Sequence, residues 1–572
     1  MIAGELKKLI EQVLSELSLS AEGFTVERPG DGKNGDYASN VALVAFRQVA
    51  AKANTKSNAI KVARGGLEIF DTPQQLADKI IEKINEHGHL AIERLEVAGP
   101  GFINFYLTPQ FFTDKVKEIL TAGESYGTNK DVAGYKVMVE YTDPNPFKLF
   151  HIGHLLPNVI GEAISRIAEA SGAEVKRACY QGDVGLHVAK AIYGLKAGQD
   201  LFKAYAFGNQ AYEGDEVAKQ EIIELNKKIY AQSDETINKL YEQGKKESLD
   251  YFEQIYKKLG TKFDYYFFES GVADFGKKLV EDNKNIFTVG EGGAVVYEGE
   301  QDGLHTRVFI NSEGLPTYEA KELGLAKIKY GKYPYDYSIV VTGNEITEYF
   351  KVLLAVMKKI FPDLAKKTRH VPHGMLRLPS GKMSSRTGEV ITAEGLIAEV
   401  KTKISEKLKD GKREGDLTDE ILTQIAVGAI KYSILKQDSS RDIIFDLDKS
   451  ISFEGSSGPY LQYTLARTNS VLEKGHEAGL KINTDKPEAP SEVERVLARY
   501  PEVVYRAGEE LAPHHLVTYL TELASAFNAY YANNKIVSED SVSNYRLALT
   551  SAVGQTLSNG LKLLGIATPV KL

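Results

Sequence analysis

The chain has 572 residues, of which 43% are hydrophobic and 26% are charged, and its formal net charge at pH 7 is −8. This composition is typical of a globular protein with several hydrophobic cores, long enough for about three or four domains. The net negative charge excludes a polycation, so any nucleic acid must be bound by local basic patches.

Cysteine content and hydropathy narrow the class of protein further. Cys179 is the single cysteine, which excludes a disulfide within the chain and a cysteine-based zinc site and is typical of a reducing compartment. No apolar run approaches the roughly 20 residues that span a bilayer, and the amphipathic start of the chain is not a secretion signal. We therefore expect a cytoplasmic protein with no membrane segment and no metal site of its own.

Residues 1–108 are predicted to form a small α/β domain, because helical and strand periodicities alternate there. Thr72-Pro73 is a typical helix start, and a Gly-Pro-Gly turn separates the two predicted strands. The predicted elements are helices near 6–17, 36–53 and 72–87 and strands over 91–97 and 102–107. By itself this region indicates no more than an accessory domain.

The stretch from Tyr135 to Gly172 predicts a nucleotide site. An apolar run over 137–141 indicates a buried strand, a turn follows, and a helix is expected from about Gly153. The sequence His-Ile-Gly-His at 151–154 thus lies at a helix N-terminus, where free N–H groups and the helix dipole favour phosphate. Two imidazoles one turn apart can donate to one phosphate, and Gly153 leaves room for a nucleotide. A pair of surface or capping histidines is the alternative interpretation.

A second segment, Lys-Met-Ser-Ser-Arg at 382–386, lies in a loop rich in Ser and Gly. A loop with Lys382 and Arg386 is suited to cover a triphosphate, where Lys382 would neutralise charge that builds up during attack on the α-phosphate. Taken alone, the segment indicates only a basic surface turn. Together with the histidine segment, it predicts a lid over a nucleotide, and we expect His154 and Lys382 to open onto one cleft.

These two segments resemble the two signature motifs of class I aminoacyl-tRNA synthetases. The first is matched at every letter, whereas Ser385 stands where the generic second motif has Lys. The form Lys-Met-Ser-Ser-Arg-x-Gly is itself similar to that of many arginyl-tRNA synthetases. The resemblance implies that ATP is bound together with Mg²⁺. It implies catalytic roles for His151, His154, Lys382 and Arg386, and ATP contacts from Lys148, His151, Gly153, His154, Lys382, Met383 and Ser384.

Residues 109–409 are predicted to form a Rossmann-like α/β domain, a parallel sheet with helices on both faces, with a charged helical insertion at about 199–258. The sequence Gly-Asp-Val-Gly-Leu-His at 182–187 follows a short strand, and the carboxyl ends of such strands are where ligands bind. This segment is also similar to the arginyl enzymes. The chain leaves no room for a large editing insert, and a side chain read by hydrogen bonds and charge can be discriminated by about 10⁴–10⁵ without one.

The order of acidic and polar residues here resembles the arginyl family closely and implies an arginine pocket. A guanidinium is planar, permanently charged and has five donors, so two carboxylates can hold it and a Tyr hydroxyl can orient it. Tyr318 and Glu322 lie four apart on a predicted helix and share a face; the family usually has Asp at the latter position. We predict Glu269 and Glu322 for the guanidinium, with Tyr318, and Asn145 for the α-amino or carboxylate end; Glu140 is equally suited to brace its loop. The full predicted set is Glu140, Asn145, His187, Glu269, Tyr318, Glu322 and Glu345.

Residues 410–572 are predicted to form an all-α helical bundle, with helices near 418–435, 514–531 and 545–564. Segments here resemble the C-terminal domain with which arginyl-tRNA synthetases grip the anticodon stem and loop, and segments of 1–108 resemble the domain that contacts the outer corner of tRNA. Aromatic side chains can stack on unpaired bases, although each Tyr is equally suited to a core. The candidates for tRNA contact are Gln462, Tyr463, Arg467, Tyr519 and Tyr530.

The resemblance to arginyl-tRNA synthetases spans nearly the whole chain. It implies ATP-dependent ligation of arginine to its tRNA through an arginyl-adenylate, with transfer to the 2′-hydroxyl of the terminal adenosine. The implied partners are L-arginine, ATP and tRNA(Arg), without DNA, and we expect a monomer. The alternatives are another class I synthetase, a smaller nucleotidyltransferase, which the C-terminal bundle disfavours, and a silent tRNA-binding relative, which the intact His151, His154 and Lys382 disfavour.

Overall fold

The computed structural model describes the chain except residues 54–59, 64–66, 378–390, 411–416, 486 and 570–572. The side chains of 49–53, 60–63, 67–69, 409 and 410 are also outside the description. The chain forms two compact units. The first contains Met1–Tyr126, Ser470–Glu502 and Ala526–Thr556, and the second contains Gly127–Asn469, Val503–Ser525 and Leu557–Leu572.

The first unit contains a four-stranded antiparallel sheet in the order β1-β2-β6-β5. Its strands are β1 (Val26–Glu27), β2 (Tyr37–Ser39), β5 (Ile92–Ala98) and β6 (Phe102–Leu107), and β3 (Ile60–Ala63) pairs with β4 (Leu67–Phe70). Its helices are α1 (Ile2–Glu16), α2 (Val41–Ala53), α3 (Pro73–His87), α4 (Pro109–Ala122) and α18 (Glu492–Leu497). One buried cluster joins α1, α2 and α3 to the sheet, through side chains such as Leu6, Ile80 and Phe105. The predicted α/β character of this region is therefore confirmed.

The second unit contains a five-stranded parallel sheet in the order β14-β13-β7-β8-β9. The strands are β7 (Lys136–Glu140), β8 (Glu174–Gln181), β9 (Tyr265–Phe268), β13 (Tyr337–Gly343) and β14 (Thr368–His373). The chain runs outward from β7 through β8 to β9, and then returns to the other side of β7 through β13 and β14. The strand order therefore reverses between β7 and β13, which is where doubly wound sheets bind ligands. The predicted Rossmann-like fold class is confirmed.

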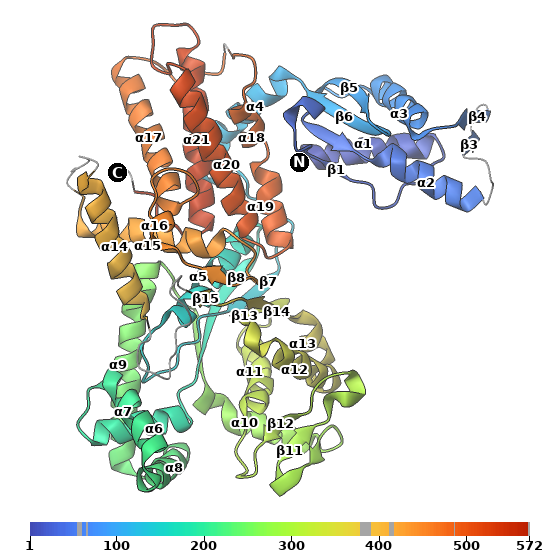
Figure 1. The fold of residues 1–572 in the computed structure, drawn as a ribbon. Helices are drawn as coiled ribbons and strands as arrows, with labels where there is room; N and C mark the ends of the chain where they lie inside the picture. Colours follow the sequence, from blue (N-terminus) through green and yellow to red (C-terminus); the bar gives the residue numbers. More distant parts are fainter. Residues whose placement is uncertain (54–59, 64–66, 378–390, 411–416, 486, 570–572) are drawn as a thin grey trace. The chain divides into compact units, whose positions relative to one another are not determined.

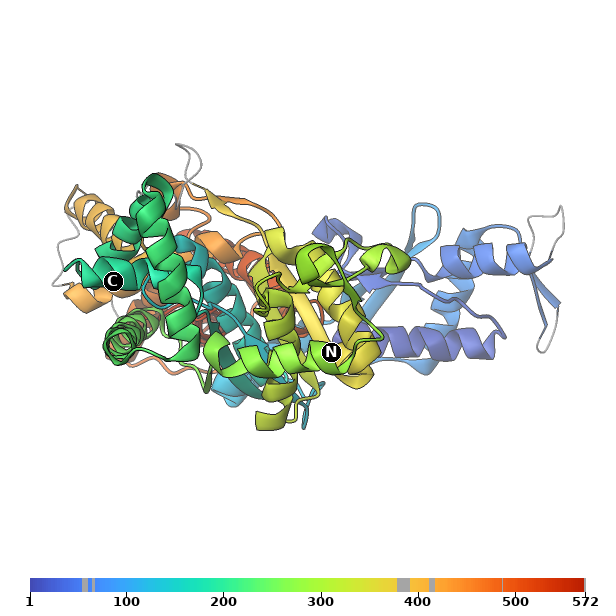
Figure 2. The same cartoon turned by 90° about the horizontal axis from the view of Figure 1, so that it is seen from below.

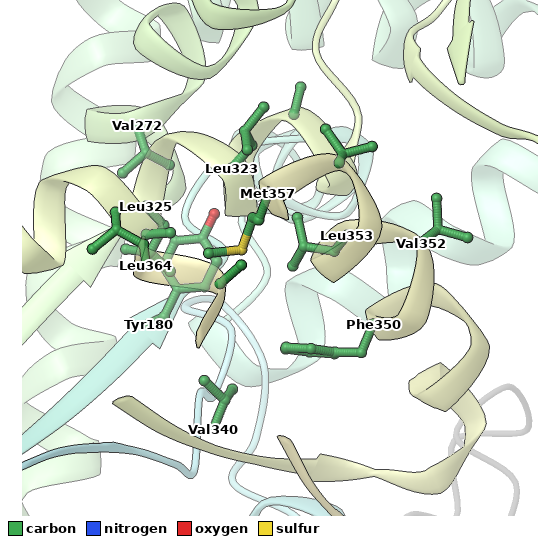
Figure 3. Close-up of a cluster of buried hydrophobic side chains, with 14 of the residues drawn as sticks. Tyr180, Val272, Leu323, Leu325, Val340, Phe350, Val352, Leu353, Met357 and Leu364 are labelled. Atoms are coloured by element: carbon green, nitrogen blue, oxygen red, sulfur yellow. The ribbon is translucent and has the colours of Figure 1, made fainter. Parts of the chain in front are cut away.

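Two groups of helices follow the strands of this sheet, coloured green and yellow-green to olive in Figure 1; Figure 2 shows the same elements from below. The first group is α6 (Leu186–Lys196), α7 (Leu201–Gly214), α8 (Glu216–Ala231) and α9 (Glu235–Leu259), and the second is α10 (Glu269–Asp282), α11 (Tyr318–Lys332), α12 (Thr347–Ile360) and α13 (Pro362–Lys367). A small antiparallel sheet holds β10 (Thr288–Val289), β11 (Val295–Tyr297) and β12 (Arg307–Ile310). The second group packs on the sheet through one apolar cluster that includes Tyr180, Leu323 and Met357 (Figure 3).

The remaining elements are largely helical, as predicted for the C-terminal region. They are α14 (Ala393–Asp410), α15 (Asp419–Leu435), α16 (Leu447–Ser450), α17 (Gly458–Glu477), α19 (Tyr500–Glu509), α20 (His514–Asn533) and α21 (Ser543–Leu563), with β15 (Leu376–Arg377) pairing β16 (Ile443–Ile444). Within the described residues, no helix is long and apolar enough to cross a membrane.

Helix α5 (Ile152–Ala170) connects β7 to β8 and packs tightly on the loop after β7. A Cβ atom on Gly161 would lie 2.3 Å from the ring of Tyr141, so no larger residue fits there. The Tyr141 hydroxyl donates to Glu162, which is 3% exposed, across 2.6 Å. Arg166 and Arg177 donate to the same carboxylate across 2.7 and 3.1 Å. Burial alone would raise the pKa of Glu162, but Arg177 and then Arg166 outweigh it and hold the pKa below normal.

Glu162→Gln is expected to lower the free energy of unfolding by about 1–3 kcal/mol, because it removes the buried charge that three donors share. The matched control is Glu169→Gln, which removes the exposed partner of the same Arg177 and should cost at most about 1 kcal/mol. Urea unfolding followed by circular dichroism measures both. Equal losses in the two variants would contradict a special role for the buried carboxylate.

Candidate active site

The candidate site lies at the carboxyl edge of the sheet, between β7 and β13. Val340 of β13 pairs with Glu140, the last residue of β7, so the loops that follow these two strands start side by side. The first loop leads through Asn145 and Lys148 to α5, and the second carries Glu345. Segments about 200 residues apart in the sequence thus meet at one edge, as parallel strand pairing requires.

His151 and His154 both cap the N-terminus of α5 and stack on each other, with ring centroids 3.7 Å apart. The backbone N–H of Gly153 donates to Nδ1 of His151 across 3.0 Å, and the N–H of His151 donates to Nδ1 of His154 across 3.3 Å. Because both Nδ1 atoms accept, the proton of each neutral ring is assigned to Nε2. The alternative of capping histidines is therefore confirmed, and capping leaves both Nε2–H groups available as donors.

Both rings are neutral at pH 7. Burial and then Lys148 lower the pKa of His151 to about 4, and burial and then His151 hold the pKa of His154 well below normal. A neutral pair donates hydrogen bonds to a phosphate or ribose without adding a fixed charge. A Cβ atom on Gly153 would lie 2.8 Å from the His151 ring. The missing side chain thus makes room for that ring, and the predicted ATP contact of Gly153 stays a prediction.

The second motif, with Lys382, Met383, Ser384 and Arg386, lies outside the described residues. The segment that follows it lies beside the first motif: Ile152 N–H donates to the carbonyl of Ile391 across 3.2 Å, and Ala393 N–H donates to the carbonyl of Phe150 across 2.9 Å. His151 and Thr392 form an antiparallel bridge between them. Ile391–Ala393 therefore lies beside the first motif, whereas a common cleft for His154 and Lys382 stays a prediction.

Two buried ion pairs lie at the predicted arginine pocket. Lys329 Nζ lies 2.7 Å from Glu140 Oε2, and Lys321 Nζ lies 2.6 Å from Glu269 Oε2, with all four residues at most 5% exposed. Sequence analysis missed both lysines. The spacing on α11 was the available signal, because Lys329 lies seven residues, or two turns, after Glu322 and so shares its face.

Glu322 has no hydrogen bond or ion pair with any residue that the structure describes. Burial and then the neighbouring Glu140 raise its pKa to about 8. Glu269 differs, because Lys321 already compensates its charge. That Glu269 and Glu322 share the guanidinium stays a prediction; of these two acids, Glu322 is the one whose charge no lysine contact compensates.

Asn145, His187 and Glu269 meet around Gly182, at the end of β8. A Cβ atom on Gly182 would lie 2.4 Å from Asn145 Oδ1 and 3.2 Å from Glu269 Oε1. His187 Nε2 lies 2.8 Å from the Gly182 carbonyl and donates to it, so Nδ1 carries a lone pair. Burial and then Lys148 lower the pKa of His187 to about 4. These three predicted residues therefore form one polar group.

The neighbouring Asp183 accepts several hydrogen bonds that hold the loop after β8 in place. Its carboxylate accepts from Lys245 and Tyr241 of α9 across 2.7 and 2.8 Å, and from the N–H and hydroxyl of Ser270 across 2.9 and 2.6 Å. Ser270 follows Glu269, so this network fixes the start of α10 against the loop after β8. A cavity of about 580 Å³ opens beside it, lined by side chains that include Asn145, Lys148, His187, Tyr318, Tyr230 and Lys321.

Glu345 is exposed and folds back on the end of β13, since a Cβ atom on Gly343 would overlap its carboxylate. Like Glu269 and Glu322, it is not among the residues that line the cavity, and neither is Glu140, which is paired with Lys329 of α11. For Glu140, substrate binding and bracing of its loop both stay predictions.

Two of the tRNA candidates are buried in the helical region. Gln462 is 0% exposed and donates to the Ala567 carbonyl across 2.9 Å, and Tyr519 is 2% exposed. Their prediction as RNA contacts is wrong, because no base can reach them without unfolding. Tyr463, Arg467 and Tyr530 are partly exposed and stay predictions. Arg467 lies over the ring of Tyr463 at 5.0 Å, and the Tyr530 hydroxyl donates to Glu488 across 3.2 Å.

Three family models match the chain: "tRNA synthetases class I (R), catalytic domain" over residues 115–447, "Arginyl tRNA synthetase N terminal domain" over 4–107, and "DALR anticodon binding domain" over 461–572. An arginine–tRNA ligase of Lactococcus lactis subsp. cremoris (strain SK11) is 32% identical, covering 98% of this chain and 99% of that protein. An arginine–tRNA ligase of Pediococcus pentosaceus is 30% identical, covering 99% of this chain and 98% of that protein.

Solved structures agree in fold. The arginyl-tRNA synthetase of Plasmodium falciparum gives a TM-score of 0.79 at 20% identity, covering 100% of this chain and 99% of that one. The Thermus thermophilus enzyme gives 0.73 at 23% identity and covers 100% of both chains. The family predicted from the motifs is confirmed by the match of the class I (R) catalytic-domain model and the full-length relatives: the chain belongs to the arginyl-tRNA synthetases, a class I family.

Proposed function

We propose that the switch point between β7 and β13 is the centre at which this protein ligates arginine to its tRNA. In the first step the arginine carboxylate attacks the α-phosphorus of ATP, and the bond to the departing pyrophosphate breaks. In the second step the 2′-hydroxyl of the terminal tRNA adenosine attacks the carbonyl carbon, and AMP leaves. The observation that carries the proposal is the carboxyl group of Glu322, which has no lysine contact while the nearby Glu140 and Glu269 each have one.

Glu322 is proposed to bind the substrate guanidinium, with Tyr318 beside it. The pairs Glu140–Lys329 and Glu269–Lys321 are each neutral overall, so the charge of Glu322 matches one bound cation. A carboxylate can receive two parallel N–H bonds from a guanidinium, which the compact ammonium of lysine cannot supply. Asn145, Glu269 and His187 lie together at the end of β8 and are proposed to bind the α-amino and carboxylate end.

The nucleotide is proposed to lie over the N-terminus of α5. The Nε2–H groups of His151 and His154 are donors for it, and the positive end of the α5 dipole favours its phosphates. Lys148, Lys382 and Arg386 would supply the positive charge that the triphosphate needs. Mg²⁺ is proposed to arrive with ATP; within the described part of the chain, no three His, Cys, Asp or Glu side chains group so that they would hold a metal ion.

The remaining predictions complete the proposal. Residues 1–108 would contact the tRNA corner, 109–409 carry the catalytic domain with its insertion at about 199–258, and 410–572 bind the anticodon region. We propose a monomer working in the cytoplasm, where protein synthesis takes place.

Aminoacylation of total tRNA with labelled arginine tests the proposed reaction. We expect charging that depends on ATP and tRNA and that labelled lysine or cysteine does not support. Charging with another amino acid would favour another class I synthetase. The absence of charging at saturating ATP would favour a silent tRNA-binding relative.

Glu322→Gln is expected to raise KM for arginine about tenfold to a hundredfold, because hydrogen bonds to a charged group contribute about 1.5–3 kcal/mol. KM for ATP should stay within about twofold, since the nucleotide site does not include this residue. Initial rates of charging measure both constants. The control is Glu348→Gln, which changes an exposed glutamate paired with Lys351. An equal loss of affinity for arginine and ATP would show that the pocket assignment is wrong.

The affinity for arginine is expected to rise with pH up to about 8. Burial and then Glu140 raise the pKa of Glu322 to about 8 in the free protein, so below that pH the carboxyl group is protonated and must lose its proton to bind a guanidinium. KM for arginine should therefore fall by roughly an order of magnitude from pH 6.5 to pH 8 and then level off. The variant Glu322→Gln should lack this dependence. A pH-independent KM in the native protein would contradict the assignment.

A further inference from the structure

Tyr180 carries a buried hydroxyl group without a hydrogen-bond partner among the residues that the structure describes. The side chain leaves the sheet near the end of β8 and is 8% exposed. Figure 3 shows its hydroxyl directed toward Leu323 of α11 and Met357 of α12. Leaving a buried hydroxyl unpaired is unfavourable, so an unpaired buried hydroxyl in a native protein calls for a structural or functional explanation.

The surroundings of this hydroxyl connect it to the proposed arginine site. Leu323 directly follows Glu322 on α11. The backbone N–H of Tyr180 donates to Asp143 Oδ1 across 2.7 Å, in the loop that carries Asn145. Burial first, and then the nearby Glu269, Glu322, Tyr349 and Glu140, raise the pKa of the Tyr180 phenol well above normal. The hydroxyl thus lies within electrostatic reach of these acidic residues, although no described residue forms a hydrogen bond with it.

We propose that the Tyr180 hydroxyl accepts a hydrogen bond from one N–H group of the substrate guanidinium, while the Glu322 carboxylate accepts hydrogen bonds from another edge of the same guanidinium. This makes Tyr180 a specificity-determining residue for arginine. A guanidinium has five N–H donors, and one carboxylate receives only two of them. Glu140 and Glu269 are occupied by Lys329 and Lys321, so the group needs a further acceptor. A hydroxyl that no protein group uses is such an acceptor. The inference rests on the proposed role of Glu322.

The competing explanation is that Tyr180 only fills the apolar cluster that it shares with Leu323, Leu325 and Met357. The two explanations predict the same effect of Tyr180→Phe on stability but different effects on arginine binding. Removing an unpaired buried hydroxyl should leave the protein as stable as before or more stable. If the hydroxyl serves arginine, the same change must weaken arginine binding.

The experiment compares the full-length native protein with Tyr180→Phe. We expect an unchanged or higher Tm without ligand, a smaller rise of Tm on adding L-arginine, and a fivefold to fiftyfold higher KM for arginine in tRNA charging. KM for ATP should stay within about twofold. Tyr335→Phe is the matched control, because it removes a buried hydroxyl of the same cluster that donates to the Ala326 carbonyl across 3.4 Å. It should leave KM for arginine unchanged.

An unchanged KM for arginine in Tyr180→Phe, or an equal rise of KM for arginine and ATP, would overturn the inference. The variant Glu322→Gln separates this failure from that of the proposed site. If Glu322→Gln raises KM for arginine and Tyr180→Phe does not, only the inference about Tyr180 is wrong. If neither variant affects arginine, the proposed arginine site is wrong.

Discussion

Charge compensation at the carboxyl edge of the parallel sheet is the constraint on which the rest of the site depends. Glu140 and Glu269 are almost completely buried, and an isolated buried carboxylate costs several kcal/mol or shifts its pKa until it is neutral. Lys329 and Lys321 relieve that cost, and both come from α11. The same helix carries Glu322, the carboxyl group without such a partner. The position of one helix against the sheet therefore sets the charge of the pocket.

This arrangement explains how the protein can fold although several carboxyl groups lie close together at this site. The two ion pairs remove most of the electrostatic cost before any ligand arrives. The remaining cost is concentrated in Glu322, whose raised pKa reflects it, and a cationic ligand would relieve it. In the proposed site, binding energy would be directed to this carboxyl group, which a guanidinium can contact through two parallel N–H bonds.

Each histidine of the pair also serves two purposes. Each ring uses Nδ1 to satisfy a backbone N–H at the start of α5 and keeps Nε2–H for a ligand. Stacking and burial keep both rings neutral, so the helix N-terminus retains the positive field that its own N–H groups provide. Asp183 in turn joins the loop after β8 to α9 and α10.

The resemblance to the arginyl family indicated most of the polar residues around Gly182. Local spacing was sufficient to predict the parallel sheet and the start of α5 at the histidine motif, because strand and helix periods and turn residues act over a few positions. It was not sufficient for the ion pairs, since Glu140 and Lys329 are 189 positions apart and only the packing of α11 brings them together. Nor did it distinguish Gln462 and Tyr519, which are buried, from the partly exposed Tyr463, because burial depends on which helices meet. The sequence by itself determined the elements, the motifs and the family. The tertiary structure decided which carboxyl group remains uncompensated and which hydroxyl remains unpaired, because both depend on contacts between distant segments.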